Sequence, residues 1–367
     1  MNYLRITLFL AIFPIGMNTI GILICNIAAC ILSLSSKINK YVLLFLSYFL
    51  VYTVLQYGVN TILNIEVSLW QIFRTEVFLY IGLLVYSSVL SNKILIQKFF
   101  LKEHFFLGGL LFLIIVSLLL NYRLYPISLN VEGSYRIYIY SAYLFSLLFA
   151  YAFYRGKFVA LIYALLIAIT FQKSLLAYLA ISSLIILFLS KSRKIFRNQV
   201  IILGLLFIAS IPMLPMIYER FHILFTQGDN WRLLEIQLAF EAILRNSYTL
   251  FFGNGVGVPY REILTASGDY SRLEEAMQYD VHNLFAEILM KFGLIFTILY
   301  MWLMIILLRG LPVPLFVACI VFIVFQGMSS PALFHSIDTL GYFLGLSLLK
   351  GHLQMDKAST IKMRETA

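Results

Sequence analysis

The sequence predicts an all-α, polytopic integral membrane protein with about 11 (10–12) transmembrane helices, and two observations lead to this fold class. The 367 residues are 62% hydrophobic and 12% charged, with a mean hydropathy of +0.92, whereas soluble domains average about 25% charged residues. Uncharged runs also repeatedly reach or approach the roughly 20 residues that a helix needs to cross a bilayer. An ordinary soluble globular domain is therefore excluded.

The transmembrane helices are predicted by cutting the apolar runs at Lys/Arg clusters and at Gly, Pro and Asn turns. The predicted spans are roughly 5–34, 41–59, 70–91, 105–121, 137–153, 157–170, 174–190, 199–217, 283–308, 312–328 and 334–349. The first run is long enough to be a kinked helix or a hairpin at Pro14 and Gly16, and the sixth is short for a full crossing. Residues 1–367 are expected to form a single transmembrane domain.

The basic residues between these spans fall on alternate sides, as the positive-inside rule requires. The clusters predicted to face the cytoplasm are Lys37 and Lys40; Lys93, Lys98 and Lys102; Arg155 and Lys157; Lys191, Arg193, Lys194 and Arg197; Arg309; and Lys350 and Lys357. This pattern explains the net charge of +10 better than nucleic-acid binding does. The cysteines Cys25, Cys30 and Cys319 fall inside predicted spans, where we expect them to act as small hydrophobic residues.

Residues 218–281 form the one long polar segment, and the alternation of charges places it outside the cytoplasm as a large periplasmic loop. It contains nine of the 17 acidic residues, and its basic residues are all arginine: Arg220, Arg232, Arg245, Arg261 and Arg272. Long loops in compact proteins are usually functional. Apolar spacing from Trp231 to Arg245 predicts an amphipathic helix within the loop.

The all-arginine composition of the loop points to an anionic ligand. Guanidinium stays charged and offers a planar fork that matches phosphate oxygens bidentately, whereas lysine is a hydrated point charge. Such arginines suit a diphosphate at a membrane surface. The alternative is that they pair with the loop's acidic residues as a solvated network.

Three glycines, Gly253, Gly255 and Gly257, occur in the run Phe-Gly-Asn-Gly-Val-Gly. A nucleotide-binding loop would need a preceding strand and a following helix in a βαβ unit. We predict instead a turn that redirects the chain after the amphipathic helix, with a backbone that approaches the substrate as the alternative.

His282 and Asn283 lie where the loop meets the ninth span. On a helix of about 100° per residue, the eleven-residue step from His282 to Gly293 predicts that they share one stripe, with the glycine allowing another helix or a lipid chain to approach below the histidine. A histidine that is merely hydrogen-bonded at the membrane surface is the alternative. Glu287 and Lys291, at i and i+4 in the same span, are expected to form an ion pair. The five histidines are scattered along the chain, so no metal site is expected.

Together these residues resemble the motif of the O-antigen ligase and Wzy-type polymerase superfamily. The resemblance is in His282-Asn283, nine further residues and Gly293, directly after the largest external loop; Phe296 stands where the motif has Gly, Thr or Tyr, which favours polymerase over ligase. Residues 229–232 followed by the glycine run are similar to the family's arginine-helix-glycine segment. Arg136 resembles an external arginine of the family, and Phe-Gln-Lys-Ser at 171–174 resembles its Ser-Arg hairpin, with Lys173 in the arginine's place.

The resemblance implies a GT-C-like helical bundle in the bacterial cell inner membrane, with its active site facing the periplasm. It implies a glycosyltransferase of O-antigen, lipopolysaccharide or other polysaccharide biosynthesis, independent of metals and cofactors, that uses oligosaccharides on undecaprenyl diphosphate. His282 and Arg232 would be catalytic, with Arg136, Arg220, Arg245, Lys173 and Asn283 binding substrate. Expected partners are the lipid-linked oligosaccharide, membrane lipid and a chain-length regulator protein.

Three functions are therefore compared. A polymerase transfers the growing glycan en bloc to the non-reducing end of a lipid-linked repeat unit, and a ligase transfers it to the lipid A core. A flippase for lipid-linked oligosaccharides, or another transporter, would instead place charges along a central path at membrane depth. The concentration of charge in one external loop favours the polymerase.

Overall fold

The computed structural model describes much of the chain, and the statements below concern those residues. They are residues 38–65, 67–103, 107, 127–129, 135–137, 142–168, 170, 172–190, 192–211, 218, 230–244, 247–258, 283–329 and 337–365. The predicted spans 5–34 and, apart from residue 107, 105–121 therefore lie outside the described residues.

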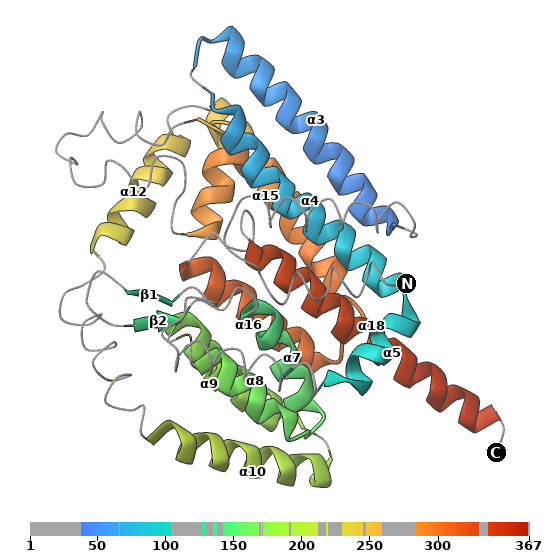
Figure 1. Ribbon diagram of the computed structural model, residues 1–367. Helices are drawn as coiled ribbons and strands as arrows, with labels where there is room; N and C mark the ends of the chain where they lie inside the picture. The colour runs from blue at the N-terminus through green and yellow to red at the C-terminus, as the bar shows by residue number, and fades with distance from the viewer. Residues whose placement is uncertain are drawn as a thin grey trace.

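The described chain is helical apart from two short strands (Figure 1). In chain order the elements are α3 (Lys40–Ile62), α4 (Leu69–Ser91), α5 (Lys93–Leu101), β1 (Ile127–Leu129), β2 (Tyr135–Ile137), α7 (Ala142–Tyr154), α8 (Val159–Ala168), α9 (Lys173–Phe188), α10 (Arg193–Ser210), α12 (Asn230–Leu244), α13 (Ser247–Phe252), α15 (Leu284–Leu308), α16 (Val313–Ser329) and α18 (Ile337–Glu365). The strands pair antiparallel with Ser128 opposite Arg136. The predicted all-α class did not include this strand pair, because a three-residue strand is too short to show the alternation of apolar and polar residues that predicts a strand.

Apolar helices long enough to cross a membrane are present among the described residues. By length and composition α3 and α15 qualify, and a third candidate is the bent pair Leu79–Ser91 and Lys93–Leu101. Shorter apolar helices are Ala142–Tyr154, Val159–Ala168, Lys173–Phe188 and Val313–Met328. The helices are compatible with a membrane protein, while the count of 11 spans and the GT-C-like arrangement stay predictions.

Several helix ends differ from the predicted spans. Residue 137 belongs to β2, so the fifth helix begins five residues later, at Ala142. α10 begins at Arg193, inside the basic cluster that was expected to separate two spans, and α18 continues to Glu365. Hydropathy marks where apolar residues stop, but lysine and arginine are good helix formers and let a helix continue into the polar region.

The predicted linker after α4 is itself a helix. α5 turns away from Leu79–Ser91 by 88°, and the Asn92 side chain caps it by accepting a hydrogen bond from the Leu95 amide at 3.1 Å. Its buried face, formed by Leu95, Ile96 and Phe99, packs on α18. The three lysines that marked a linker therefore lie on or just after a short amphipathic helix.

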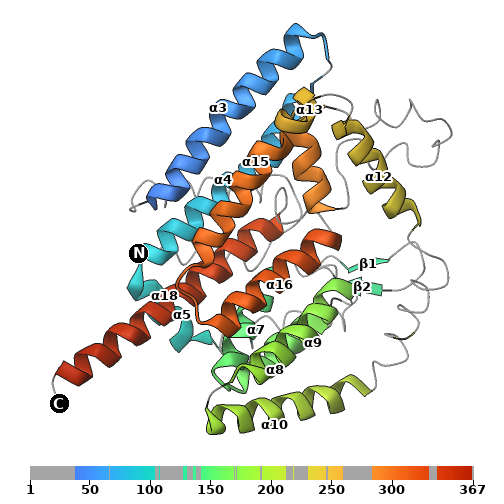
Figure 2. The same cartoon turned by 180° about the vertical axis from the view of Figure 1, so that it is seen from behind.

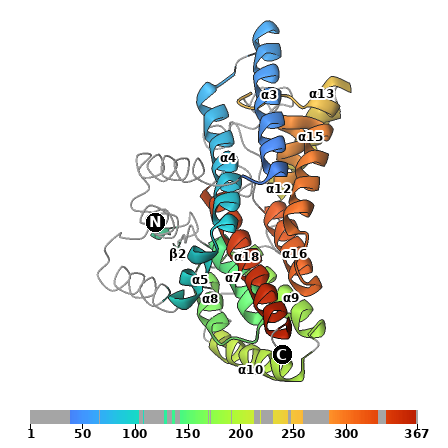
Figure 3. The same ribbon diagram turned by 90° about the vertical axis from the view of Figure 1, so that its right-hand side faces the viewer.

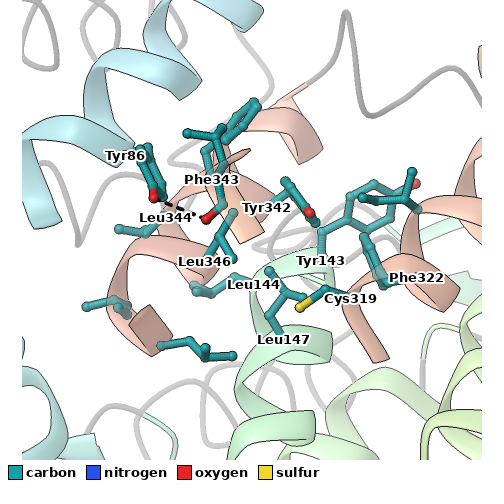
Figure 4. Packing of buried hydrophobic residues seen from close by; sticks show 14 of the residues in the cluster. Tyr86, Tyr143, Leu144, Leu147, Cys319, Phe322, Tyr342, Phe343, Leu344 and Leu346 are labelled. Atoms are coloured by element: carbon teal, nitrogen blue, oxygen red, sulfur yellow. Dashed lines mark hydrogen bonds between the residues drawn. The ribbon is translucent and has the colours of Figure 1, made fainter. Parts of the chain in front are cut away.

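The part of the core in Figure 4 lies where α4, α7, α16 and α18 meet, and it contains several aromatic side chains; buried residues of α3, α8, α9 and α15 belong to the same core. α18 packs against α4 on one side and α7 on another. Close packing is possible because Gly82 of α4 leaves room for the Phe343 ring, whose nearest atom would lie 2.6 Å from an added Cβ. Cys319 is fully buried in α16 beside these rings, which confirms its prediction as a small hydrophobic residue; Cys25 and Cys30 lie outside the described residues.

Basic residues predicted to share one side meet at one end of the bundle. Arg155, at the end of α7, pairs with Asp356 of α18 at 2.9 Å, and Lys350 donates to the Leu307 carbonyl near the end of α15 at 2.8 Å. The start of α10 joins them, since Asn198 donates to the Gly156 carbonyl at 3.2 Å. Figure 3 shows α10 at this end and α13 at the opposite end, above α15.

Candidate functional site

The site is built around the first half of α15. Asn283 is the N-cap of this helix: its backbone is extended, and its side-chain oxygen accepts hydrogen bonds from the Phe285 and Ala286 amides, both at 3.0 Å. Such a cap satisfies two of the amides that a helix leaves without partners at its start. Asn283 therefore has a structural role at the position where a substrate-binding one was predicted.

The predicted stripe shared by His282 and Gly293 is wrong, because it needs an uninterrupted helix. Asn283 is extended, so the helix begins after His282, and Gly293 has φ 72° and ψ −177°, which is not helical. α15 is thus two helical halves joined at Gly293. His282 itself lies outside the described residues, and its catalytic role stays a prediction.

The glycine segment (residues 253–257) lies against this break (Figure 2). The Asn254 amide donates to the Met290 carbonyl at 2.8 Å and the Gly255 amide to the Lys291 carbonyl at 2.9 Å. A broken helix leaves carbonyls unbonded, and in a membrane such groups must find partners inside the protein. The loop supplies two of these partners.

Glycine is required on both sides of this contact. Gly253 and Gly293 both have positive φ, of 73° and 72°. A Cβ on Gly253 would lie 2.4 Å from the Lys291 carbonyl oxygen, and one on Gly293 would lie 2.4 Å from the Phe251 carbonyl oxygen. The predicted turn is confirmed. The close approach at Gly293 is made by the backbone of Phe251, at the end of α13, and by Gly253 just after it, so another helix approaches there as expected.

The amides of the glycine segment are largely committed to protein. Besides the two bonds to α15, the Gly253 amide donates to the Thr249 carbonyl at 2.9 Å. Three successive amides, of residues 253–255, therefore have backbone partners. This arrangement leaves fewer backbone groups of the segment for the alternative in which it approaches the substrate.

The predicted ion pair in α15 is confirmed. The Lys291 ammonium donates to the Glu287 carboxylate at 2.6 Å, with side-chain exposures of 3% and 0%. The pair lies one turn above the break at Gly293, next to the carbonyls that the glycine segment contacts. Charged residues inside a candidate span are expected to pair with one another, as these two do.

The helix predicted from Trp231 to Arg245 is confirmed as α12. Ala239, Ala242 and Ile243 are buried on one face and pack against Ala286 and Met290 of α15. The polar segment between α10 and α15 is thus docked onto α15 twice, through α12 and through the glycine segment.

Two of the predicted arginines lie in described elements. Arg232 is in the first turn of α12, with its side chain outside the described part, and Arg136 is the middle residue of β2. Arg245 follows the last residue of α12, and it and Arg220 lie outside the described residues. Their contacts with a ligand stay predictions.

Lys173 and Asn283 are brought to the same end of the bundle through α16. Lys173 begins α9, and the next residue, Ser174, donates to the Gln326 side chain at 3.2 Å. Adjacent Gly327 leaves room for Phe285, whose ring would come within 2.8 Å of an added Cβ. The starts of α9 and α15 therefore flank the end of α16.

Sequence reasoning missed one polar feature of the site, on α3. Tyr52, Gln56 and Asn60 recur every four residues, so they share one face of this helix. They contact the glycine segment and the break of α15, about 190 to 240 residues away in sequence. Their spacing within an otherwise apolar span was the available signal.

Among the described residues, no group of three or more His, Cys, Asp or Glu side chains is placed to hold a metal ion. What the described site offers is a helix start, a buried ion pair and a docked polar segment whose described part contains Arg232. In comparisons with known proteins, no protein-family model and no curated protein matches the chain.

Proposed function

We propose that the chain is an inner-membrane glycosyltransferase, an O-antigen or polysaccharide polymerase. It would transfer a glycan from undecaprenyl diphosphate en bloc to the non-reducing end of a lipid-linked repeat unit. The reaction would take place at the periplasmic face, independent of a metal ion.

One observation supports the proposal most directly. The parts of the sequence that resemble the polymerase superfamily are separated along the chain, yet α12 and the glycine segment both pack on the half of α15 that begins after Asn283. Residues that act on one substrate must converge in this way. Lys173 begins its helix at the same end.

The chemistry fits the residue types. The acceptor hydroxyl would form a C–O bond to the anomeric carbon while the bond from that carbon to the diphosphate oxygen breaks, and the diphosphate leaves with the electron pair. His282 would take the hydroxyl proton, since a base of near-neutral pKa is effective at physiological pH. Arg232 and Arg136, with Arg220, Arg245 and Lys173, would stabilise the negative charge on the leaving group.

Phe296 favours the polymerase over a ligase. It stands where the superfamily motif has Gly, Thr or Tyr, and in the structure its ring is fully buried and stacks on Phe292 with ring centroids 4.3 Å apart. The chain uses this position for packing. A ligase that transfers the glycan to lipid A core is the nearest alternative.

A flippase for lipid-linked oligosaccharides is the second candidate, and the Glu287–Lys291 pair is the observation that favours it. Transporters place such charges at membrane depth. A flippase should tolerate replacement of His282, whereas a glycosyltransferase that uses it as a base should not.

The first test is the glycan pattern of a strain that lacks the protein. A single repeat unit on the lipid core indicates a polymerase, and a core without any repeat indicates a ligase. A normal ladder in the deletion strain would contradict both enzymes.

The second test is the turnover of purified protein with lipid-linked repeat units. His282→Ala should lower turnover by roughly 10² to 10⁴, the usual effect of removing a general base, and turnover of the unaltered protein should persist in EDTA. His352→Gln, at the opposite end of the bundle, is the control and should keep near-normal turnover. Wild-type turnover in His282→Ala would remove the histidine from the mechanism.

A further inference from the structure

The polar side chains of α3 form a buried contact with two other parts of the chain. The α3 stripe (Tyr52, Gln56 and Asn60) has exposures of 6%, 4% and 3%. Other faces of α3 expose Leu50, Val51, Val54 and Leu55, as expected of a helix that faces lipid. Polar groups buried in such a helix need hydrogen-bond partners within the protein.

Each residue of the α3 stripe binds a backbone carbonyl near the break. The Tyr52 hydroxyl lies within hydrogen-bonding distance of the Phe292 carbonyl, at 2.8 Å, and of the Phe252 carbonyl, and its single proton is donated to one of them at a time. The Gln56 amide donates to the Phe252 carbonyl at 2.7 Å, and the Asn60 amide donates to the Asn254 carbonyl at 3.2 Å. The stripe therefore joins α3, the end of α13 with the glycine segment, and the break of α15.

Two further contacts tie the stripe together. The Gln56 amide also donates to the Tyr52 hydroxyl at 3.0 Å, and the Tyr248 hydroxyl of α13 donates to the Gln56 side-chain oxygen at 3.3 Å. Gly255 packs closely against Asn60. A Cβ added to Gly255 would lie 2.3 Å from the side-chain amide nitrogen of Asn60, so only glycine leaves room for this side chain. Shape and hydrogen bonding thus both fix the glycine segment against α3.

We infer that Tyr52, Gln56 and Asn60 are positioning residues, which hold the polar segment between α10 and α15 at the break of α15. The function of this contact rests on the proposed glycosyltransferase. The held segment contains Arg232 and Arg245, and α15 begins beside His282. The α3 stripe therefore holds the glycine segment, and with it the polar segment that carries Arg232, against the half of α15 that follows His282 in the sequence.

This role predicts a specific kinetic effect. A variant that removes a hydrogen bond of the α3 stripe keeps the arginine and histidine side chains but changes where they lie relative to each other. A misplacement of about 1 Å can lower a rate by roughly 10²-fold. Turnover should fall more than substrate affinity.

The test compares Gln56→Met and Tyr52→Phe with Tyr57→Phe and Thr61→Val. The first two variants remove a donor while keeping most of the side-chain volume, and the two control variants remove hydroxyls from exposed positions of the same helix. Tyr52→Phe is the milder change and keeps the experiment informative if Gln56→Met does not fold.

Hydrogen exchange of residues 253–258 is the first measurement and does not depend on enzymatic activity. Loss of one buried hydrogen bond should speed exchange there by roughly tenfold or more, with little change in α18. Unchanged exchange in both variants would overturn the inference.

Turnover and KM with lipid-linked repeat units are the second measurement. We expect turnover to fall roughly 10- to 100-fold with KM within about threefold of the control variants. Faster exchange with normal turnover would overturn the positioning role. If the unaltered protein transfers no glycan, the proposed function fails, and the exchange measurement alone decides whether the α3 stripe holds the segment.

Discussion

Glu287 and Lys291 form an ion pair that solvent does not reach, at a separation of 2.6 Å. Desolvation of two charges costs several kcal/mol, and their attraction offsets this only while both are present. Removal of one partner leaves a buried charge without compensation. The pair is therefore a sensitive point in α15, whichever function the protein has.

Single and double replacements of this pair should differ in how much stability they cost. Glu287→Leu or Lys291→Met alone should lower the free energy of unfolding by about 3–5 kcal/mol, whereas the double variant should be close to neutral. Gln237→Leu with Glu241→Leu is the control, because that exposed i, i+4 pair, bonded at 2.9 Å, is worth only about 0.2–0.5 kcal/mol. Unfolding in detergent measures these values, and additive losses in the Glu287/Lys291 double variant would contradict the prediction.

The geometry of the Arg232 side chain, and not its charge alone, should matter for glycan transfer. Lysine keeps the charge but loses the planar fork that binds a diphosphate bidentately. Arg232→Lys should therefore lose most of the activity, measured as glycan ladders, while Arg309→Lys at the exposed basic end should not. Near-normal ladders from Arg232→Lys would assign Arg232 to a solvated network with the acidic residues of its loop.

At the scale of elements, the packing around α15 depends on two glycines, Gly293 and Gly253, whose positive φ angles are rarely adopted by residues that have a side chain. The break at Gly293 exposes carbonyls that α3 and the glycine segment then bind. Gly253 faces this break with positive φ and no space for a side chain. The two halves of α15 and the glycine segment therefore form one packing unit.

Three glycine replacements separate backbone strain from steric clash. Gly310 has φ 90° with nothing within 4 Å of an added Cβ, and Gly58 is helical and equally open. Gly310→Ala should cost about 1–2 kcal/mol, the penalty of the left-handed conformation, and Gly58→Ala should stabilise α3 by about 0.5–1 kcal/mol. Gly253→Ala should cost clearly more than Gly310→Ala, because it adds a clash with the Lys291 carbonyl. Equal losses of stability at Gly253 and Gly310 would contradict the packing seen here.

The sequence predicted the apolar helices better than it predicted their interruptions. α3 and α4 begin within one residue of the predicted spans, and α15 begins within one residue of the ninth. The end of α4 at Ser91 agrees with the predicted span, whereas the helix α5 that follows Asn92 and the break at Gly293 were not predicted. Hydropathy averages over a window and does not report the backbone angles of single residues. An Asn or Gly inside an apolar run indicates an interrupted helix only when another part of the chain is known to bind the backbone carbonyls that the interruption leaves without partners.

The candidate site was predictable where its residues are neighbours in sequence. The helix from Trp231 and the Glu287–Lys291 pair follow from local spacing, and both are confirmed. The α3 stripe could not be assigned a partner, since Gln56 and Phe252 are 196 residues apart. The stripe shared by His282 and Gly293 was wrong because local spacing assumed a continuous helix.

At the scale of the whole molecule, basic residues and the candidate site occupy opposite ends. Arg155 and Lys350 meet α18 and α15 at one end. At the other, the Ser68 amide at the start of α4 donates to the Gly257 carbonyl at 2.9 Å, and Asn283 caps α15. Positive residues are retained in the cytoplasm, so this polarity predicts that residues 218–281 face the periplasm.

A cysteine at Ser267, which lies outside the described residues in this predicted loop, tests the orientation. Cys25, Cys30 and Cys319 would first be replaced by alanine, and a membrane-impermeant thiol reagent would be added to whole cells. A cysteine at Ser267 should react with the reagent in intact cells. A cysteine at Ser192, exposed at the start of α10 among the basic residues, should react only after lysis, because the membrane would separate it from the reagent. The reverse pattern would place the arginine-rich segment in the cytoplasm, on the wrong side for a polymerase that acts on glycans already moved across the membrane, and would remove the proposed mechanism along with the orientation.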